Sequence, residues 1–433
     1  MIIEQFNGLI SSVIKNSLYL VDYQKTKIQE LVYSVKGNAK IIIVTEANWT
    51  VPIAWFGLYS PIYMIALGLS KVEVGLVTSL GIAVAAIGTI LGATISDRLG
   101  QKRTLMIFDS LTWLTAMLVF SFAQNIWWFI AGTIINNLCM IAMASWQCLF
   151  VEGTPKDKRA NIYAFLQVML NGASLLVPLA GMIVDGFGLV MGCRIMYFIS
   201  SISMGAGLYY RGKHLKETEV SRKTVKEKKK YNFGEEVKKF KEAFLNIKER
   251  KQLFWYCIVQ ILVGFALVMW NTYYPIFLTD TKGIGLADSE ISIYPFIFSI
   301  VMISIIFIFI PHVKEKKFKK YLVFATMFSV VGALFYVFAP AHKGSFIAIA
   351  FIFNGISMAF FRPLSDAYSM NLLTDAERSR IVSVFNTIII LAMVPAAPIG
   401  GYLYLINPRL IFLAVAIIFV ISIVIMKVKF TEE

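Results

Sequence analysis

Twelve long apolar runs dominate the sequence and restrict what it can fold into. A run of about 20 apolar residues crosses the roughly 30 Å hydrocarbon core of a bilayer as a helix. Windows of that length place the runs near residues 41–66, 72–95, 104–124, 127–150, 161–184, 193–211, 253–278, 290–311, 321–340, 345–370, 382–405 and 409–427. Hydrophobic residues make up 58% of the chain and charged residues 15%, against about 45–50% and about 25% in a soluble domain. The sequence therefore predicts an all-α integral membrane protein, because a helix satisfies its backbone hydrogen bonds within the bilayer.

The basic residues follow the topology that these runs predict. The net charge is +15, and with a cytoplasmic N-terminus 35 of the 41 Lys and Arg residues fall on the cytoplasmic side. Five lie on the other side, Arg362 lies within a span, and Arg211 counts with the loop that follows the sixth run. Such an asymmetry is typical of multi-pass membrane proteins. It predicts a protein of the cell membrane with both termini in the cytoplasm, and it explains the basic charge without nucleic acid as a partner.

The chain shows no pattern typical of an enzyme, a metal site or a cofactor site. Its four cysteines lie in or beside apolar runs without a CxxC pair, and its three histidines are scattered over loops. A nucleotide-binding P-loop is missing, so the chain has no recognisable site for ATP. An intramembrane enzyme would need paired Asp, HExxH or Ser/His elements in adjacent spans, which the sequence lacks. We therefore expect no catalytic residue, no metal and no cofactor.

One short loop carries a recognisable motif. Residues 91–105, LGATISDRLGQKRTL, join the second and third runs through Asp97, Arg98, Gly100, Lys102 and Arg103. The loop resembles the signature of the major facilitator superfamily, Gly-x-x-x-Asp-Arg-x-Gly-Arg-Lys/Arg, which lies between the second and third helices of its members. Ala93 replaces the first Gly of that pattern, and Gln101 replaces an Arg. Considered without the family, the same residues form a basic turn that fixes topology, in which Gly100 is free to take a positive φ.

The second half of the sequence repeats the first. Three landmarks occur twice, at offsets of 214 to 221 residues: Pro61 with Pro275, Arg159 with Arg380, and Pro178-x-x-Gly181 with Pro398-x-x-Gly401. This repeat extends the resemblance over nearly the whole chain from residue 41. The resemblance implies the fold of the superfamily, with two six-helix halves related by pseudo-twofold symmetry. The signature loop of the second half has lost its Asp and Gly but keeps its cations.

The same repeat sets the expected domain organisation. We expect residues 1–40 to form an amphipathic segment at the cytoplasmic membrane surface, with a short disordered arm as the alternative. The two halves cover 41–211 and 253–427, and 428–433 form a cytoplasmic tail. Residues 212–252 form a cytoplasmic linker with an amphipathic helix and the basic run KEKKK. That run is either a topology signal or a binding site for anionic lipids.

The resemblance also implies where the substrate binds. Transporters built from two such halves bind substrate near the middle of the bilayer, between the halves, and in the superfamily the first, fourth, seventh and tenth helices line that cavity. The expected substrate and proton pathway comprises Glu46, Trp49, Gly57, Asn136, Gln147, Asn171, Gln260, Trp270, Asn271, Tyr274, Asn354, Arg362 and Asp366. Arg362 and Asp366 are four residues apart and able to pair. They either belong to a binding site or gate, or hold the tenth helix against a neighbour.

A cytoplasmic gate is a further implication of the resemblance. Asp97 is expected to face the start of the eleventh helix, near residues 379–383, where the helix dipole favours a negative charge. The expected gating motif comprises Asp97, Arg98, Gly100, Lys102, Arg103, Glu152, Arg159 and Arg380. Because Gln101 replaces the Arg of the family pattern, Lys102 or Arg103 would supply any ion pair to Glu152.

As a member of this superfamily, the chain is expected to be a monomeric secondary active transporter that works by alternating access. Its partners would be a small-molecule substrate, protons and membrane lipid. Pro178-x-x-Gly181 partly resembles an antiporter motif and favours export of amphiphilic compounds, whereas the lack of an arginine in the fourth span argues against drug antiport. Uptake or facilitated passage of a sugar, an organic acid or another metabolite is the alternative. A non-transporting sensor on the same fold is the alternative of another class.

Proton coupling is expected because uphill transport without ATP needs an ion gradient. Carboxylates within spans are the candidate proton carriers, and these are Glu46, Asp109 and Asp366. Glu46 ranks first because its own span has no cation within one helical turn, while Asp366 lies one turn from Arg362. Asp109 ranks last because the third helix usually packs behind the cavity. The competing interpretation of Glu46 is a hydrated side chain at the cytoplasmic mouth.

Overall fold

The computed structural model describes residues 36–151, 166–167, 169–227, 241–242, 244–308, 318–372 and 375–430. These residues form helices and short connections, with no strand among them. Eleven of their helices are long and apolar enough to cross a membrane, and a further apolar helix, Glu290–Ile306, is shorter. The predicted all-α membrane fold is confirmed, because an apolar helix lies at each of the twelve runs.

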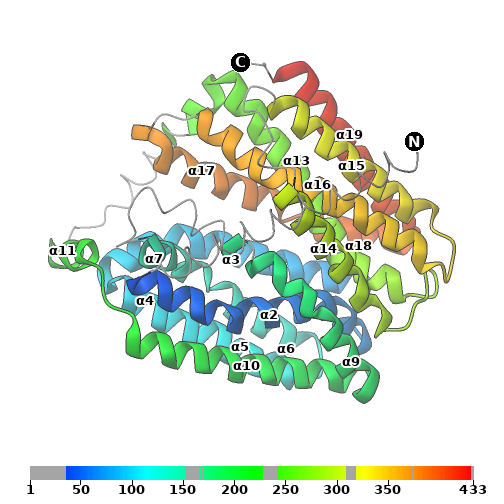
Figure 1. The fold of residues 1–433 in the computed structure, drawn as a ribbon, viewed down its shortest axis with the longest axis horizontal. Coiled ribbons are helices and arrows are strands. Elements are labelled where there is room, and N and C mark those ends of the chain that lie inside the picture. Colours follow the sequence, from blue (N-terminus) through cyan, green and yellow to red (C-terminus); the bar gives the residue numbers. More distant parts are fainter. Residues whose placement is uncertain are drawn as a thin grey trace, which may run out of the picture.

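The helices form two groups, which Figure 1 shows one above the other. The first half, blue to green, comprises α2 (Gly37–Ala66), α3 (Lys71–Leu99), α4 (Gln101–Asp109), η1 (Ser110–Thr115), α5 (Ala116–Ser121), α6 (Ile126–Asn137), α7 (Met140–Val151), η2 (Ala173–Leu176), α9 (Val177–Phe187) and α10 (Leu189–His214). The second half, light green to red, comprises α13 (Lys251–Thr279), η3 (Glu290–Ser292), α14 (Ile293–Ile308), α15 (Phe318–Phe338), α16 (Gly344–Asn371), α17 (Asp375–Met393), α18 (Ala396–Ile406) and α19 (Arg409–Lys429). Between them in the chain lies α11 (Glu219–Glu227).

The two halves contact each other through equivalent helices. α3, the second span of the first half, packs along α17 and α18, which together form the fifth span of the second half. In the same way α14, the second span of the second half, packs against η2 and α9 in the fifth span of the first half. This reciprocal packing agrees with the pseudo-twofold relation between the halves.

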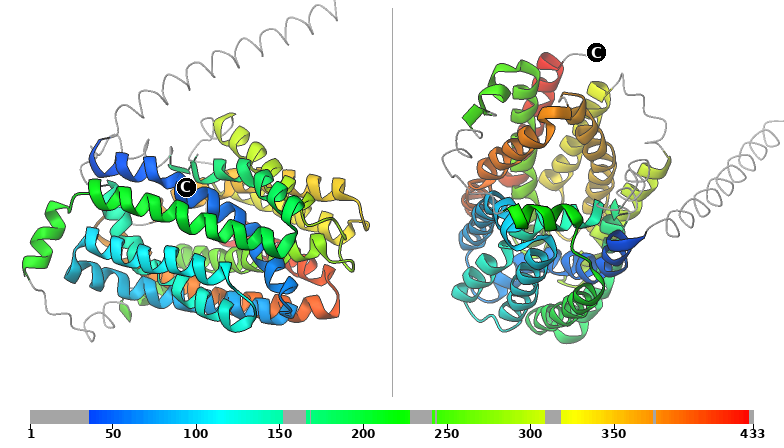
Figure 2. Two further views of the ribbon diagram at one scale, coloured as in Figure 1. Left: turned by 90° about the horizontal axis from the view of Figure 1, so that it is seen from below. Right: turned by 90° about the vertical axis from the view of Figure 1, so that its left-hand side faces the viewer.

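The two ends of the helix bundle differ. We call the end with α11, the last turn of α10 and the start of α13 the linker end, and the opposite end the distal end. In Figure 1 the ribbons of the two halves lie apart on the left, at the linker end, and converge on the right, where α9, α14 and α18 lie. Viewed from the linker end, the halves are two separate groups of helices (Figure 2, right).

Prolines mark matching positions in the two halves. Pro61 lies inside α2 and Pro275 inside α13, the first span of each half. Pro178 lies in the first turn of α9, directly after the short helix η2, where its missing N–H group costs no hydrogen bond. The eleventh span breaks in the same way, since α17 ends at Met393 and α18 follows Pro395. Local sequence therefore breaks the fifth span of each half.

Some predictions lie outside the described residues. These concern residues 1–35 of the expected amphipathic segment, Glu152, Arg159, and the last three residues of the KEKKK run. In the expected linker helix, Ile247 is buried in the core while Phe244 is exposed. The division of the chain into five segments stays a prediction.

Candidate functional site

Three charged side chains form a buried cluster inside the first half. Arg211, in the last turn of α10, is 2% exposed. Its Nη2 atom lies 2.8 Å from Oε2 of Glu46 on α2, and its Nη1 atom lies 3.7 Å from Oδ2 of Asp109 on α4. The Nε–H group of Arg211 donates to Thr45 Oγ1 at 2.8 Å, and Arg211 Cζ lies 3.8 Å from the ring centroid of Trp49. We call these five residues the charge cluster.

The charge cluster holds more negative than positive charge. With all three groups ionised, two carboxylates face one guanidinium, so the formal charge is −1, and one added proton makes the cluster neutral. Charges inside a membrane helix bundle are costly unless they are paired. Arginine suits this position because its planar guanidinium binds a carboxylate and stacks on an aromatic ring at the same time.

Sequence reasoning missed Arg211, because it assigned this residue to the loop after the sixth run. α10 continues to His214, so Arg211 lies inside the helix and not in the loop. Long side chains on a helix point back toward its N-terminus, which for Arg211 is into the bundle. A signal was nevertheless present in the sequence. Glu46, Asp109 and Arg211 are charges of opposite sign in the apolar spans of one half.

The helix that carries Asp109 changes form directly after it. The third span runs as α4 to Asp109, then as the π-helical segment η1, and then as α5. Such segments are rare, and many of them occur at functional sites. The Oγ1 atom of Thr112, inside η1, is buried and has no hydrogen-bond partner. The irregular helix therefore begins at one of the cluster's carboxylates.

The pathway residues predicted in the first half are dispersed. Glu46 and Trp49 belong to the charge cluster. Gly57 and Gln147 are exposed, and the Nδ2 atom of Asn136 is buried without a hydrogen-bond partner. The backbone oxygen of Asn171 accepts a hydrogen bond from Ser299 on α14, a contact between the halves.

The pathway residues predicted on α13 lie in two different environments. Gln260 on α13 donates to Ser365 Oγ on α16, and Asn271 is exposed on the same face of α13, eleven residues further on. Trp270 stacks on Tyr274, with ring centroids 4.6 Å apart, inside the apolar core.

The predicted residues of the tenth span all lie on α16. Asn354 packs against Gly332 of α15. Arg362 and Asp366 are both exposed, and no ion pair or hydrogen bond within the described part of the chain joins their side chains. Whether they take part in a site stays a prediction.

The signature loop binds the start of the linker. Gly100 has φ of +91°, and a Cβ atom there would lie 2.8 Å from Glu217 Oε2. The backbone N–H groups of Gln101 and Lys102, at the start of α4, donate to the Glu217 carboxylate at 3.1 Å each. Thr218 donates to the Gln101 side chain at 2.7 Å. A carboxylate thus lies at a helix N-terminus, as its dipole favours, and Gln101 has its own partner.

The structure describes only some of the residues that were predicted to form the gate. Asp97, Arg98 and Arg103 are exposed, and Asp97 does have an interaction partner. Arg380 belongs to α17, but its side chain lies outside the described residues. The contact between Asp97 and the start of α17, and an ion pair to Glu152, stay predictions.

At the distal end, polar side chains join the halves. Lys71 Nζ, at the start of α3, lies 3.4 Å from Asp280 Oδ2, just after α13. Tyr404 donates to the same carboxylate oxygen at 3.0 Å. The hydroxyl of Tyr273 lies 3.0 Å from the carbonyl oxygen of Lys71, and the hydroxyl of Tyr59 donates to the carbonyl oxygen of Asp288 at 3.1 Å.

These neighbours determine the charge state of Asp280. Partial burial alone would raise its pKa. The N–H group of Lys282, the hydroxyl of Tyr404 and the Lys71 ammonium outweigh that effect and hold the pKa of Asp280 below its usual value. The Asp280 carboxyl group is therefore ionised at neutral pH and able to pair with Lys71.

The two Pro-x-x-Gly motifs also lie at this distal contact. A Cβ atom on Gly181 would lie 2.8 Å from the Ser289 carbonyl oxygen and closer still to Ser292. A Cβ atom on Gly401 would lie 2.9 Å from Cα of Val72, at the start of α3. Each half thus places the glycine of its fifth span against the start of the opposite half's second span. The structure gives the motif a packing role that the sequence did not reveal.

Comparisons with known proteins agree with this architecture. The family model described as Major Facilitator Superfamily matches residues 47–342 and 316–433. The crystal structure of the nucleoside transporter NupG is similar, with a TM-score of 0.69, 13% identity, and coverage of 93% of this chain and 100% of that one. A POT family transporter in complex with 5-aminolevulinic acid has a TM-score of 0.66, 13% identity, and coverage of 92% and 98%. No curated protein sequence matches the chain significantly.

Proposed function

The chain belongs to the major facilitator superfamily of membrane transporters, and on that premise we propose that it is a secondary active transporter of a small organic solute. The reciprocal contact of the two halves at the distal end is the observation that carries this proposal. There α3 meets α18, and α9 meets η3, through close-packed glycines. Lys71 at the start of α3 also forms an ion pair with Asp280, just after α13. Contacts of this kind allow one end to separate while the other closes, which is the requirement of alternating access.

We further propose that transport is coupled to protons through the charge cluster. The sequence favoured Glu46 because its own span holds no nearby cation, and the ion pair with Arg211 of α10 removes that reason. The support is now the excess of carboxylate: Glu46 and Asp109 share one guanidinium, so a single proton brings the cluster to neutrality. Two interacting carboxylates bind that proton as a unit, which gives Asp109 a share in the role that the sequence favoured for Glu46. Asp366 is less suited, because its exposed side chain has no comparable buried partner.

The direction of transport and the orientation complete the proposal. The linker end, with its basic residues, faces the cytoplasm of the cell membrane, and the closed distal end faces outward. Export of small amphiphilic compounds is the proposed direction. The substrates named for similar solved structures are nucleosides and peptides, and at about 13% identity they support the fold and not a substrate for this chain.

The proposal is tested by solute flux in proteoliposomes with and without an imposed pH gradient. We expect the gradient to increase accumulation by the wild type. Glu46→Gln and Asp109→Asn should each abolish that increase, while Asp366→Asn should keep it as the matched control. Flux that ignores the gradient would refute proton coupling and leave a facilitator. No flux of any solute from a broad panel, with ligand binding retained, would favour a sensor.

A further inference from the structure

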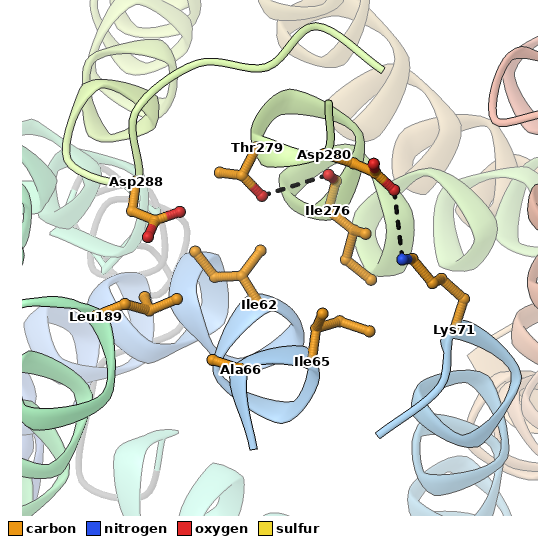
Figure 3. A pocket seen from close by; sticks show the side chains of 9 residues that line it. All are labelled: Ile62, Ile65, Ala66, Lys71, Leu189, Ile276, Thr279, Asp280 and Asp288. Carbon is orange, nitrogen blue, oxygen red and sulfur yellow. Dashed lines mark hydrogen bonds and ion pairs between the residues drawn. The ribbon is translucent and has the colours of Figure 1, made fainter. Parts of the chain in front are cut away.

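A cavity lies between the halves at the distal end, outside the charge cluster. Its volume is about 230 Å³, and its lining comes from both halves: Ile62, Ile65, Ala66, Lys71, Leu189, Ile276, Thr279, Asp280 and Asp288. Figure 3 shows Asp288 and Leu189 on one side of this space and the Lys71–Asp280 pair on the other. Most of the lining is aliphatic.

The cavity lining carries two carboxylates and one ammonium group. Lys71 is the cation of the lining, and it already pairs with Asp280, which also accepts hydrogen bonds from Tyr404 and Lys282. The hydrogen bond that the structure shows at Asp288 involves its backbone oxygen, which accepts from the Tyr59 hydroxyl. Among the described residues, no hydrogen bond or ion pair reaches the Asp288 carboxylate. One half-buried negative charge therefore faces the cavity without a counter-charge.

The surroundings decide which kind of ligand suits that carboxylate. A calcium ion takes about six to eight oxygen ligands, whereas this cavity offers one unpaired carboxylate among aliphatic walls. Within the described residues there is no group of three or more His, Cys, Asp or Glu that would hold a metal. An organic ammonium needs less, because one carboxylate binds its charge and the aliphatic walls bind its hydrocarbon part. The volume is below the roughly 300–1,000 Å³ of pockets for drug-sized ligands, so the ligand is small.

We propose that this cavity is a binding site for small organic cations that carry an ammonium group on an apolar skeleton. The ammonium binds the carboxylate of Asp288, and the skeleton packs on Ile62, Ile65, Leu189 and Ile276. The cavity lies where the halves meet at the distal end, and it is already partly open to the surroundings. Binding itself does not depend on the proposed function. The inference rests on that function only where it makes the cavity an outer binding site on the transport pathway for such cations.

The direct test is binding of radiolabelled 2-phenylethylamine to the purified protein by equilibrium dialysis at pH 7, corrected for uptake by empty micelles. We expect saturable binding that Asp288→Asn weakens by about tenfold to hundredfold, the value of a charge-assisted hydrogen bond. Ala66→Leu, which fills the cavity from the opposite half without changing charge, should also abolish binding. Glu290→Gln is the matched control. It removes a charge two residues away, outside the lining, and should bind as the wild type does.

The outcomes separate this inference from the transport proposal. Equal binding by wild type and Asp288→Asn would overturn the inference, as would equal affinity for the neutral 2-phenylethanol. Flux in proteoliposomes combined with no amine binding would end the inference and leave the proposed function in place. Amine binding of the expected pattern without flux of any solute would support the inference and refute the proposed transport function.

The pH dependence provides a second readout. Burial raises the pKa of Asp288 above its usual value, and the groups facing it are Tyr59, Cys193, and the already paired Lys71 and Asp280. A protonated carboxyl group has no charge to offer an ammonium. Amine binding should therefore be complete above the raised pKa and decline as the pH falls through it, at a higher pH than for an ordinary Asp. A pH-independent affinity between pH 4 and pH 8 would contradict the role of Asp288.

Discussion

At the scale of single residues, the burial of Arg211 organises the interior of the first half. Its guanidinium reaches α2 through Glu46 and Thr45, α4 through Asp109, and the ring of Trp49. Gly207, one turn earlier on α10, lies against the same ring, where a Cβ atom would come within 2.6 Å of Trp49. The tryptophan thus packs closely enough on α10 to hold the guanidinium between ring and carboxylates.

The first prediction concerns the removal of this arginine. Arg211→Met leaves two buried carboxylates without a cation and should destabilise the protein by about 3–5 kcal/mol, the usual cost of breaking a buried pair. The melting temperature of the purified protein in detergent measures this loss. The triple variant Glu46→Gln, Asp109→Asn, Arg211→Met removes all three charges and should recover most of the stability. Lys213→Met, at an exposed position of the same helix, is the control, and a similar melting temperature for both single variants would contradict the prediction.

Gln101 shows how one residue can depart from a family pattern without loss of structure. The sequence reveals only that the usual Arg is missing there. In the fold, the Gln101 side chain accepts from Thr218, and its backbone N–H donates to Glu217. The linker thus supplies partners for the signature loop, which no local pattern predicts because they are more than a hundred residues away.

At the scale of helices, the broken fifth and eleventh spans form the distal contact. Each break carries a proline, and each glycine three residues after Pro178 or Pro398 packs against the opposite half. A small residue allows this close approach of helices in a membrane protein. The repeated motif is therefore tied to closure of the distal end.

The second prediction follows from these glycines. Gly181→Ala and Gly401→Ala should each force the halves apart at the distal end, because the added methyl group meets backbone atoms of the other half. Overpacking of about 1–3 kcal/mol shifts a two-state equilibrium by roughly 5- to 150-fold. Spin labels at Gln124 and Lys343, in exposed loops of the two halves, should report a longer mean distance by pulsed electron resonance. Gly186→Ala, on α9 with open space around it, should leave the distance unchanged, and the prediction fails if the three variants behave alike.

At the scale of the whole molecule, the two halves contact each other as a pseudo-symmetric pair. α3 lies along α17 and α18, and α14 lies against η2 and α9. Because the distal contacts include a charged pair and several hydrogen bonds between the halves, the described conformation is closed at that end. In the proposed alternating-access cycle, these polar contacts would have to break as a group.

The third prediction concerns orientation in the membrane. In a background without the four cysteines, a Lys343→Cys variant should react with an impermeant maleimide on intact cells, and an Arg222→Cys variant, on α11, should not. Both side chains are exposed, so accessibility to the reagent reports the side of the membrane. After the cells are opened, both variants should react, which controls for reactivity. Labelling of the Arg222→Cys variant alone on intact cells would invert the proposed topology.

The sequence by itself determined the membrane class, the number of apolar spans, the two-half repeat and the family. These follow from hydropathy, charge asymmetry and spaced motifs, which are properties of local stretches and survive without any knowledge of packing. The matching positions of Pro61 and Pro275 belong to the same class, because they are read directly from the repeat.

Only the tertiary structure decided which side chains meet. Glu46, Asp109 and Arg211 come from three different helices. Glu217 belongs to the linker and binds the signature loop. Asp288 faces a cavity whose other wall belongs to the first half. Within an apolar span almost every position is hydrophobic, so hydropathy does not show which face turns inward. Helix rotation and packing fix that face, and with it they fix which of the described charges are paired, as at Arg211, and which face a cavity without a partner, as at Asp288.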